Sequence, residues 1–432
     1  MLRNAAFEKG DKQKRNQPRH DVDLMLTHPV SKRSQIELKS YSMNVLTKSY
    51  SPVASTSNWT NQTPNTDTDP AVGTSLAAIF HGRPGSLELA SVKTPTPGPG
   101  EMLVRVEGCL LGRRTLHAFQ NQDRDHSPVI LGCETSGHIE AFGPGARCFD
   151  WREKPLKIGT RIVWASTTVC GECFCCRRGI TQRCLRSSRY GDYVGMHEEL
   201  LLGGLSEHCL IASGTSIVSI PETLPLGVAS QLCGPTALAN AALERCGTTA
   251  PKSMLIIGAG LCGLTLAAMA REHGVDEIIV CDMNPQRVEF ANNFGASQSG
   301  SPLDLSAMVS KATAGYGVDI GYDFSGSPAA PEMLLPQIRM GGSIVFLNTR
   351  IAAAYKAIPV NAIVSRHLSL TGVQGYQAKH LANAADFMNS HHTSYPFEST
   401  IATWYSLDNA QCAALEALNP TNFRIGIAPR SR

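Results

Sequence analysis

The segment 253–282 constrains the fold more than any other part of the sequence. It begins with an apolar stretch, SMLII, continues through Gly258, Gly260 and Gly263 into a helical stretch, and ends in a second apolar stretch that closes on Asp282. A strand, a glycine-rich turn, a helix and a second strand in this order form one unit of a doubly wound α/β sheet. Because further apolar strands alternate with helical stretches up to about residue 372, we predict a parallel sheet with helices on both faces.

The same segment predicts a dinucleotide-binding site. Gly258 permits the tight turn, Gly260 lets the backbone approach a pyrophosphate, and Gly263 lets the helix pack closely on the strand. Asp282 follows Gly263 by nineteen residues, where a carboxylate accepts hydrogen bonds from ribose hydroxyls and repels a 2′-phosphate. We therefore expect NAD as the cofactor. Arg287, five residues beyond Asp282, could stack beside the adenine or offer charge to NADP, which stays the alternative cofactor.

Four cysteines with the spacing C-x2-C-x2-C-x7-C predict a metal centre. They are Cys170, Cys173, Cys176 and Cys184, and Cys175 lies between them outside the spacing. Four thiolates close a tetrahedral shell around zinc and leave no open position, which is typical of structural zinc rather than catalytic zinc. We therefore expect one structural zinc here and treat Cys175 as a bystander.

Length and composition indicate about two domains and a small-molecule ligand. The chain has 432 residues, 42% of them hydrophobic and 17% charged, with a net charge of +3. These values do not favour nucleic acid or a membrane surface as a partner. No apolar run is long enough to span a membrane, and the first thirty residues do not resemble a secretory signal. We therefore expect a cytoplasmic protein.

Changes in residue pattern along the chain place the domain boundaries. The first segment is polar and lacks apolar periodicity, the second has short strands separated by Gly and Pro, and the third has the strand–helix alternation. We expect a disordered or weakly ordered extension, a β-rich domain, a dinucleotide-binding domain and a final segment that returns to the β-rich domain. These parts cover residues 1–70, 71–235, 236–372 and 373–432.

Taken together, these motifs resemble the zinc-containing medium-chain alcohol dehydrogenases over about residues 76–430. The resemblance rests on the glycine turn with Asp282, the four-cysteine segment, Gly132-Cys133-Glu134 and the segment around Cys233. The stretches GCETSGHIEAFGPGA, LCGPTALANAALE and RVEFANNFGA are most similar to a branch associated with phosphonate catabolism. The resemblance implies a Rossmann domain inserted in a GroES-like catalytic domain, and a dimer or tetramer.

The resemblance also implies a catalytic zinc site, which this sequence alters. In the family, one ligand is a Cys in a C-G-x-D-x-H motif, the second is the His of G-H-E and the third is a later Cys or acid. Here Gly112 stands at the first position and Cys133 at the second, while Glu134 remains and Cys233 matches the third. Cys133, Glu134 and Cys233 could still hold a zinc with one open position. Cys109 lies nearby in sequence, but strand alternation points it to the opposite face from Gly112.

Three further positions bear on the substrate. His117 matches the final His of the family motif and is a candidate for proton transfer, but Arg114 stands where the family has the Ser or Thr of the proton relay. An arginine stays protonated and cannot take that role. With Arg113 it could instead bind a carboxylate, phosphate or phosphonate, which predicts an anionic substrate.

Three functions remain open at this point. The first is an NAD(P)-dependent dehydrogenase or reductase that moves hydride between nicotinamide and an alcohol or carbonyl carbon. The second keeps hydride transfer without a catalytic zinc and reduces an activated C=C or C=N bond, which the changes at Gly112 and Cys133 favour. The third is a nucleotide-binding protein that has lost catalysis.

Overall fold

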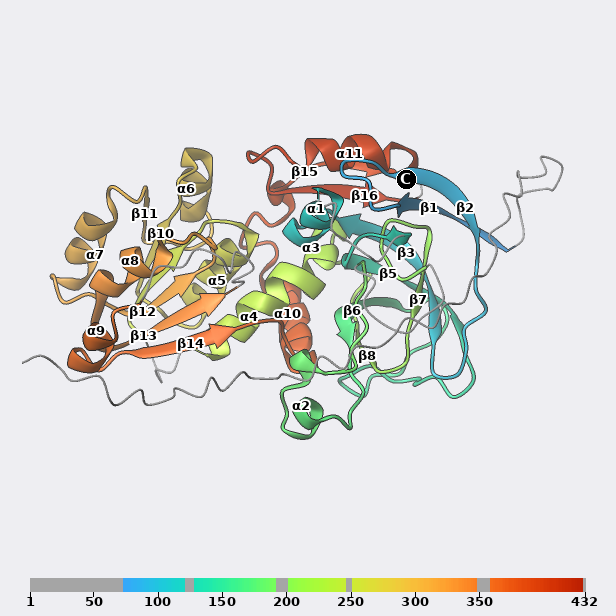
Figure 1. Ribbon diagram of the computed structural model, residues 1–432, viewed down its shortest axis with the longest axis horizontal. Coiled ribbons are helices and arrows are strands. Elements are labelled where there is room, and N and C mark those ends of the chain that lie inside the picture. Colours follow the sequence, from blue (N-terminus) through green and yellow to red (C-terminus); the bar gives the residue numbers. More distant parts are fainter. Residues whose placement is uncertain (1–72, 121–127, 192–200, 246–250, 348–357, 430–432) are drawn as a thin grey trace, which may run out of the picture. The chain divides into compact units, whose positions relative to one another are not determined.

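The computed structural model describes residues 73–120, 128–191, 201–245, 251–347 and 358–429. Three sheets organise these residues (Figure 1). The predicted extension 1–70 lies outside them. Within this part of the chain, no helix is both long and apolar enough to cross a membrane.

The glycine-rich segment belongs to a six-stranded sheet in which all neighbouring strands are parallel. The strand order is β11-β10-β9-β12-β13-β14. Along the chain, β10 and β11 are therefore added on one side of β9, whereas β12, β13 and β14 are added on its other side. This reversal between β9 and β12 is the switch point at which doubly wound sheets bind ligands. The strands are β9 (Ser253–Ile257), β10 (Glu277–Cys281), β11 (Gln298–Gly300), β12 (Val318–Asp323), β13 (Ile338–Leu347) and β14 (Ser369–Val373).

Helices cover both faces of this sheet because its strands are apolar on both sides. Met254 and Ile256 of β9 pack in one cluster with residues of α4, α5 and α10, whereas Leu255 and Ile257 pack in another with residues of α7 and α8. All four side chains are buried. The helices are α4 (Ala237–Glu244), α5 (Leu261–Glu272), α6 (Pro285–Asn292), α7 (Leu305–Thr313), α8 (Ala330–Leu334), α9 (Val360–Ser365) and α10 (Ala378–His391).

The β-rich part contains a seven-stranded sheet that joins the two ends of the described chain. Its order is β15-β16-β3-β5-β6-β8, with β7 also pairing with β3. Because β16 pairs antiparallel with β3, the last segment of the chain returns to this sheet. The strands are β3 (Met102–Leu110), β5 (Glu134–Phe142), β6 (Arg161–Thr168), β7 (His208–Ile211), β8 (Thr215–Ser219), β15 (Ile401–Ser406) and β16 (Arg424–Ala428).

A smaller sheet and several short helices complete the described structure. The smaller sheet has the order β2-β1-β4, formed by β1 (Thr74–Phe80), β2 (Glu88–Lys93) and β4 (Val129–Ile130). The remaining α-helices are α1 (Arg113–Gln120), α2 (Phe174–Arg177), α3 (Leu226–Gln231) and α11 (Ala410–Glu416). One π-helical turn, Leu232–Thr236, contains Pro235 and connects α3 to α4. Short 3-10 turns cover Thr181–Arg183, Leu335–Gln337, Glu398–Thr400 and Leu407–Asn409.

Candidate functional site

Each of the three glycines after β9 has the local geometry that its predicted role requires. Gly258 has φ +103°, and a Cβ there would lie 2.8 Å from the backbone nitrogen of Ser325. A Cβ on Gly263 would lie 2.1 Å from the carbonyl oxygen of Gly258, so only glycine allows α5 to begin this close to β9. A Cβ on Gly260 would meet no atom within 4 Å. The space beside Gly260 is therefore open at the N-terminus of α5, where a phosphate is stabilised by backbone N–H groups.

Asp282 follows β10 directly and is held against this turn. One carboxylate oxygen accepts a hydrogen bond from the backbone N–H of Ala259 at 2.7 Å, and the other accepts one from Asn284 at 2.8 Å. These bonds fix the carboxylate beside the open space at Gly260. The position suits hydrogen bonding to ribose hydroxyls and disfavours a 2′-phosphate.

Arg287 lies on α6, five residues after Asp282, and contacts the segment that leads into β16. Its Nη2 donates to the carbonyl oxygen of Pro420 at 2.9 Å, and its Cζ lies 5.3 Å from the ring centre of Phe423. Burial lowers the pKa of Arg287 from its ordinary value, although Asp282 opposes that change. In this conformation Arg287 is engaged by the C-terminal segment, which the sequence did not indicate.

The four predicted zinc ligands come together around α2. Their sulfur atoms all lie within 4.8 Å of one another, with Sγ–Sγ distances of 3.4 Å for Cys173–Cys176, 3.9 Å for Cys170–Cys176 and 4.0 Å for Cys173–Cys184. The edge of a tetrahedron of thiolates around zinc measures about 3.8 Å for Zn–S bonds of about 2.3 Å. The four residues therefore fit a structural zinc ion.

Backbone N–H groups donate to these sulfur atoms, although burial raises the pKa of Cys176 to about 12. Leu185 N–H donates to Cys173 Sγ at 3.4 Å, and Cys170 N–H donates to Cys184 Sγ at 3.3 Å. The bond from Leu185 is the largest contribution that lowers the pKa of Cys173 to about 6. A thiol that loses its proton this readily suits a zinc ligand, because the thiolate is the form that binds metal.

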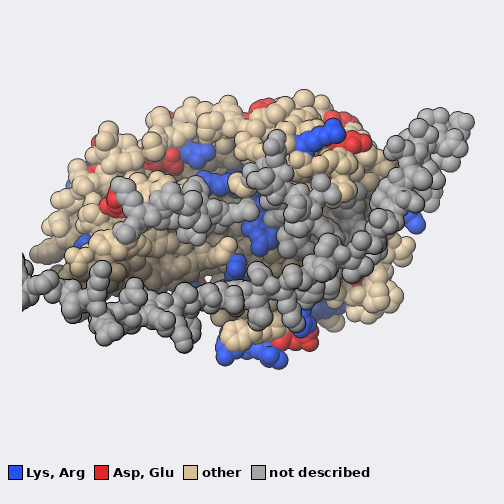
Figure 2. All heavy atoms as spheres, viewed as in Figure 1, with Lys and Arg blue, Asp and Glu red and all other residues tan. Residues whose placement is uncertain are grey.

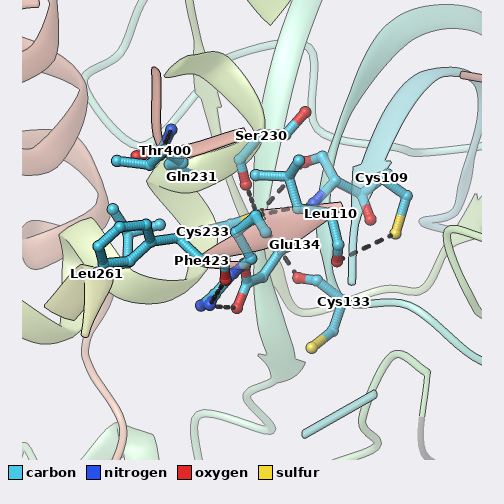
Figure 3. Close-up of polar contacts among 12 residues, drawn as sticks. Cys109, Leu110, Cys133, Glu134, Ser230, Gln231, Cys233, Leu261, Thr400 and Phe423 are labelled. Carbon is cyan, nitrogen blue, oxygen red and sulfur yellow. Dashed lines mark hydrogen bonds and ion pairs between the residues drawn. The ribbon is translucent and has the colours of Figure 1, made fainter. Parts of the chain in front are cut away.

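Glu134, labelled in Figure 3, lies at the start of β5 and forms an ion pair with Arg424 at the start of β16. The guanidinium is bidentate: Nε lies 2.8 Å from Oε2 and Nη2 lies 3.1 Å from Oε1. Both side chains are largely buried, at 11% exposure for Glu134 and 13% for Arg424. Arg424 is a site residue that sequence reasoning missed, because nothing local marks a partner 290 positions away.

The ligand atoms of Cys133, Glu134 and Cys233 do not all lie within 4.8 Å of one another. Cys233 Sγ accepts a hydrogen bond from Thr135 N–H at 3.1 Å and lies 3.5 Å from the carbonyl oxygen of Cys133. Cys133 thus presents its backbone oxygen to Cys233 (Figure 3). Among the described residues, the group whose ligand atoms all approach within 4.8 Å is the four-cysteine group.

Cys109 and His117 are the other two candidates near this centre. A Cβ on Gly132 would lie 2.6 Å from Cys109 Sγ, and one on Gly204 would lie 2.8 Å from it, so Cys109 packs against these glycines. Its thiol contacts the carbonyl oxygen of Leu110 at 3.8 Å. Strand alternation predicts that Cys109 faces away from Gly112, and this packing agrees with that prediction. His117 is exposed on α1.

Arginines from both parts of the structure lie close enough to act on one another electrostatically. Arg113 of α1 donates from Nη1 to the carbonyl oxygen of Ser325 at 3.4 Å, just after β12. Arg113 and Arg424 both act on Arg287 electrostatically and reinforce the lowering of its pKa by burial. Figure 2 shows Lys and Arg side chains near the middle of the face in view. These arginines bring positive charge to this part of the structure, which suits an anionic ligand.

A separate cavity of about 290 Å³ lies between the zinc segment, α4 and the start of α10. None of the predicted site residues lines it. Its main charged groups pair with one another, since Glu244 contacts Lys379 at 2.6 Å and His380 at 2.8 Å. This cavity is thus distinct from the glycine turn and from the Glu134–Arg424 pair.

Two families match this chain in sequence. Residues 98–222 match the alcohol dehydrogenase GroES-like domain, and residues 262–390 match the zinc-binding dehydrogenase family. The L-threonine 3-dehydrogenase of Pyrococcus horikoshii is 30% identical over 311 residues, which are 68% of this chain and 84% of that protein. The L-threonine 3-dehydrogenase of Coxiella burnetii is 28% identical over 295 residues, which are 67% of this chain and 81% of that protein.

Solved structures share the fold. An alcohol dehydrogenase from Thermotoga maritima superposes with a TM-score of 0.77 at 21% identity, covering 83% of this chain and all of that one (100%). A zinc-binding dehydrogenase from Sinorhizobium meliloti, bound to NADP, gives a TM-score of 0.72 at 22% identity, covering 82% and 99%. The predicted Rossmann domain within a GroES-like domain is confirmed by these likenesses.

Proposed function

Because this chain is an NAD(P)-dependent enzyme of the zinc-containing medium-chain alcohol dehydrogenase family, we propose that it transfers hydride between NAD and a small alcohol or carbonyl substrate. The observation that carries the proposal is the open space at Gly260, bordered by the carboxylate of Asp282 and by arginines. A bound nicotinamide cofactor supplies the hydride donor or acceptor.

The residues of the chain supply binding and orientation. The N-terminus of α5 and the turn at Gly258 receive the pyrophosphate, and Asp282 receives the adenosine ribose. The preference for NAD rests on Asp282, whose carboxylate repels a 2′-phosphate. The four-cysteine segment holds a structural zinc that stabilises its own loop.

We further propose that the substrate carries a negative charge. Nη1 of Arg113 lies 3.4 Å from the carbonyl oxygen of Ser325, just after β12. An arginine there can pair with a carboxylate or a phosphonate. The L-threonine 3-dehydrogenases that resemble the chain act, by name, on an amino acid, which has a carboxylate.

Localisation and assembly follow from general arguments. A centre of four thiolates remains intact in a reducing compartment, which supports the cytoplasm as its location. The family resemblance supports a homodimer or homotetramer.

The test is turnover by the zinc-loaded, full-length protein. Purified chain is mixed with NADH or NADPH and a panel of aldehydes, 2-oxo acids and enones, and with NAD and the matching alcohols. We expect absorbance at 340 nm to change with at least one class, at a higher kcat/KM with NADH than with NADPH. Binding of NADH without turnover of any substrate would favour the non-catalytic alternative.

A further inference from the structure

The carboxylate of Glu134 fills the place that a side chain at position 112 would need. A Cβ on Gly112 would lie 2.1 Å from Oε1 of Glu134 and 2.6 Å from its Cδ. A Cβ on Gly234, in the π-helical turn next to Cys233, would lie 2.7 Å from Cγ of Glu134. Real Cβ contacts do not approach below 3.0 Å. The carboxylate therefore sits between two glycines, one of them where the family has its first zinc ligand.

Arg424 keeps the carboxylate in that place. Its bidentate contacts, at 2.8 Å and 3.1 Å, use both oxygens of Glu134. Its Nη1 donates to the carbonyl oxygen of Phe423 at 2.9 Å, which orients the guanidinium. A largely buried carboxylate needs such a partner, because an unpaired charge is costly away from water. Glu134 is thus committed to an arginine rather than to a metal.

Cys233 is committed in the same way. Its sulfur accepts the N–H of Thr135 at 3.1 Å and lies 3.4 Å from the carbonyl oxygen of the same residue. These contacts turn the sulfur toward the backbone of β5. With Gly112 in place of a ligand, the donor set of a catalytic zinc is not assembled among the described residues. By contrast, the four cysteines around α2 are already grouped for a metal.

We propose that the Glu134–Arg424 pair takes the place of the catalytic zinc, that each chain binds one zinc ion, and that the substrate is a carbonyl compound conjugated to a C=C bond. This inference rests on the hydride transfer proposed above. The reaction of such a substrate does not need a metal on its oxygen, because conjugation already makes the β-carbon electron-poor. Within the described structure, three of the five N–H groups of Arg424 have protein acceptors, so the guanidinium has further donors for a substrate oxygen.

The step balances without a metal. Hydride from C4 of the reduced nicotinamide forms a C–H bond at the β-carbon, and the cofactor is left oxidised. The electron pair of the C=C bond moves toward the carbonyl and gives an enolate, whose negative oxygen is stabilised by the nearby guanidinium. A proton from water then forms the second C–H bond at the α-carbon.

The first test measures metal by mass spectrometry in the full-length protein purified with zinc present. We expect about one zinc per chain, unchanged in Cys133→Ser and Cys233→Ser and lost in Cys173→Ser. Cys175→Ser is the matched control in the four-cysteine segment and should keep its zinc. About two zinc ions per chain, with one lost in Cys233→Ser, would overturn the inference. A zinc-free wild-type protein would overturn it as well, because the single zinc would be missing.

The second test separates the metal from the substrate class. Full-length protein is assayed with NADH before and after a brief treatment with 1,10-phenanthroline. Its turnover rate with an enone is compared with its turnover rate with an unconjugated aldehyde. We expect enone turnover at least about tenfold above aldehyde turnover, without loss on chelation while the structural zinc remains bound. Faster aldehyde turnover, or enone turnover that chelation abolishes with the structural zinc retained, would overturn the inference. Absence of turnover with every substrate would contradict the proposed hydride transfer, whereas the zinc count would still decide the metal part.

Discussion

At the scale of single residues, two glycines of the cofactor turn should affect different properties, one the stability of the fold and the other cofactor binding. Gly260 has φ −72° and an empty neighbourhood, whereas Gly263 faces the carbonyl oxygen of Gly258 at close range. The same substitution, glycine to alanine, should therefore act on different properties at the two positions. One methyl group enters the space for the cofactor, and the other enters the contact between α5 and β9.

Gly260→Ala should fold normally and bind NADH poorly. Its backbone conformation suits alanine, so we expect an unfolding free energy unchanged or higher by up to about 1 kcal/mol. The methyl group should raise the Kd for NADH by about tenfold or more, equivalent to about 1.4 kcal/mol. Gly263→Ala should instead lose about 2 kcal/mol of stability, because its Cβ would overlap a backbone oxygen. Chemical denaturation and NADH fluorescence titration of both variants check this, and equal effects at the two positions would contradict it.

Asp282 should decide between the two nicotinamide cofactors. Asp282→Ala removes the carboxylate that is held by Ala259 and Asn284, and with it the acceptor for ribose hydroxyls. We expect the Kd for NADH to rise about tenfold or more, as loss of a hydrogen bond to a charged group costs about 1.5 kcal/mol or more. The Kd for NADPH should change less, because a repulsive charge is also lost.

Two further variants control for indirect effects. Asp282→Asn preserves the shape of the side chain and removes its charge, so it should narrow the NADH–NADPH difference as well. Glu289→Ala, on the exposed side of α6, should leave both Kd values unchanged. An unchanged ratio of the two Kd values in Asp282→Asn would argue against this role.

At the scale of elements, the zinc segment is short and depends on its metal. α2 has four residues, and Cys173, Cys176 and Cys184 are the buried residues of its small cluster. So short a helix is not stable by itself, since helix nucleation is unfavourable. The four sulfur atoms should therefore hold this loop through zinc rather than through an apolar core.

Cys173→Ser should release zinc and destabilise this segment. Metal binding is coupled to folding at such a site, and we expect a loss on the order of 4 kcal/mol. The expected result is loss of the bound zinc and a lower midpoint in thermal unfolding. Cys175→Ser, two residues away, should change neither property. Full zinc content together with wild-type stability in Cys173→Ser would show that the segment does not need the metal.

Local sequence predicts an element well when the partners are close in the chain. The four cysteines span residues 170–184, and Asp282 follows Gly258 within one strand–helix–strand unit, so spacing alone brings the correct atoms together. The ion pair between Glu134 and Arg424 depends on β16 returning beside β3, which no local pattern specifies. The contact of Arg287 with Pro420 depends on the same return.

The same limit applies to the proposed change in the catalytic zinc site. By resemblance, Gly112 stands where the family has a zinc ligand, but the sequence does not show what fills that place. That answer comes from the side chain of Glu134, which is positioned by an arginine of the C-terminal strand. Sequence thus identified the changed position, and the tertiary structure shows what occupies it.

At the scale of the whole molecule, each large sheet is linked to neighbouring segments by a carboxylate that accepts several hydrogen bonds. Asp150 accepts the N–H groups of Arg152 and Lys154 on one oxygen and the N–H and hydroxyl of Ser219 on the other. Asp319 accepts from Lys252, Ser253 and Arg339. Each carboxylate thus connects segments far apart in the sequence.

Because of these carboxylates, the unfolding free energy of the chain should change with pH in the acid range. Burial alone would raise the pKa of Asp150 and of Asp319, but their hydrogen bonds outweigh it and hold both pKa values below the ordinary 3.8. A carboxyl group whose pKa is lower in the folded state stabilises the fold fully above the unfolded pKa. That stabilisation is lost as the pH falls through the lower, folded pKa.

Asp150→Asn and Asp319→Asn should therefore matter at neutral pH and lose their effect in acid. At pH 7 we expect each variant to unfold with about 2 kcal/mol less free energy than the wild type, because an amide cannot accept all of these hydrogen bonds. The difference should stay constant down to about pH 5 and shrink below about pH 4. Urea denaturation at fixed zinc measures it, and the comparison of each variant with the wild type at each pH cancels metal loss common to both. Asp276→Asn, an exposed surface change, should show no such difference, and a gap that persisted undiminished at pH 3 would mean that these carboxylates act through packing rather than through their charge.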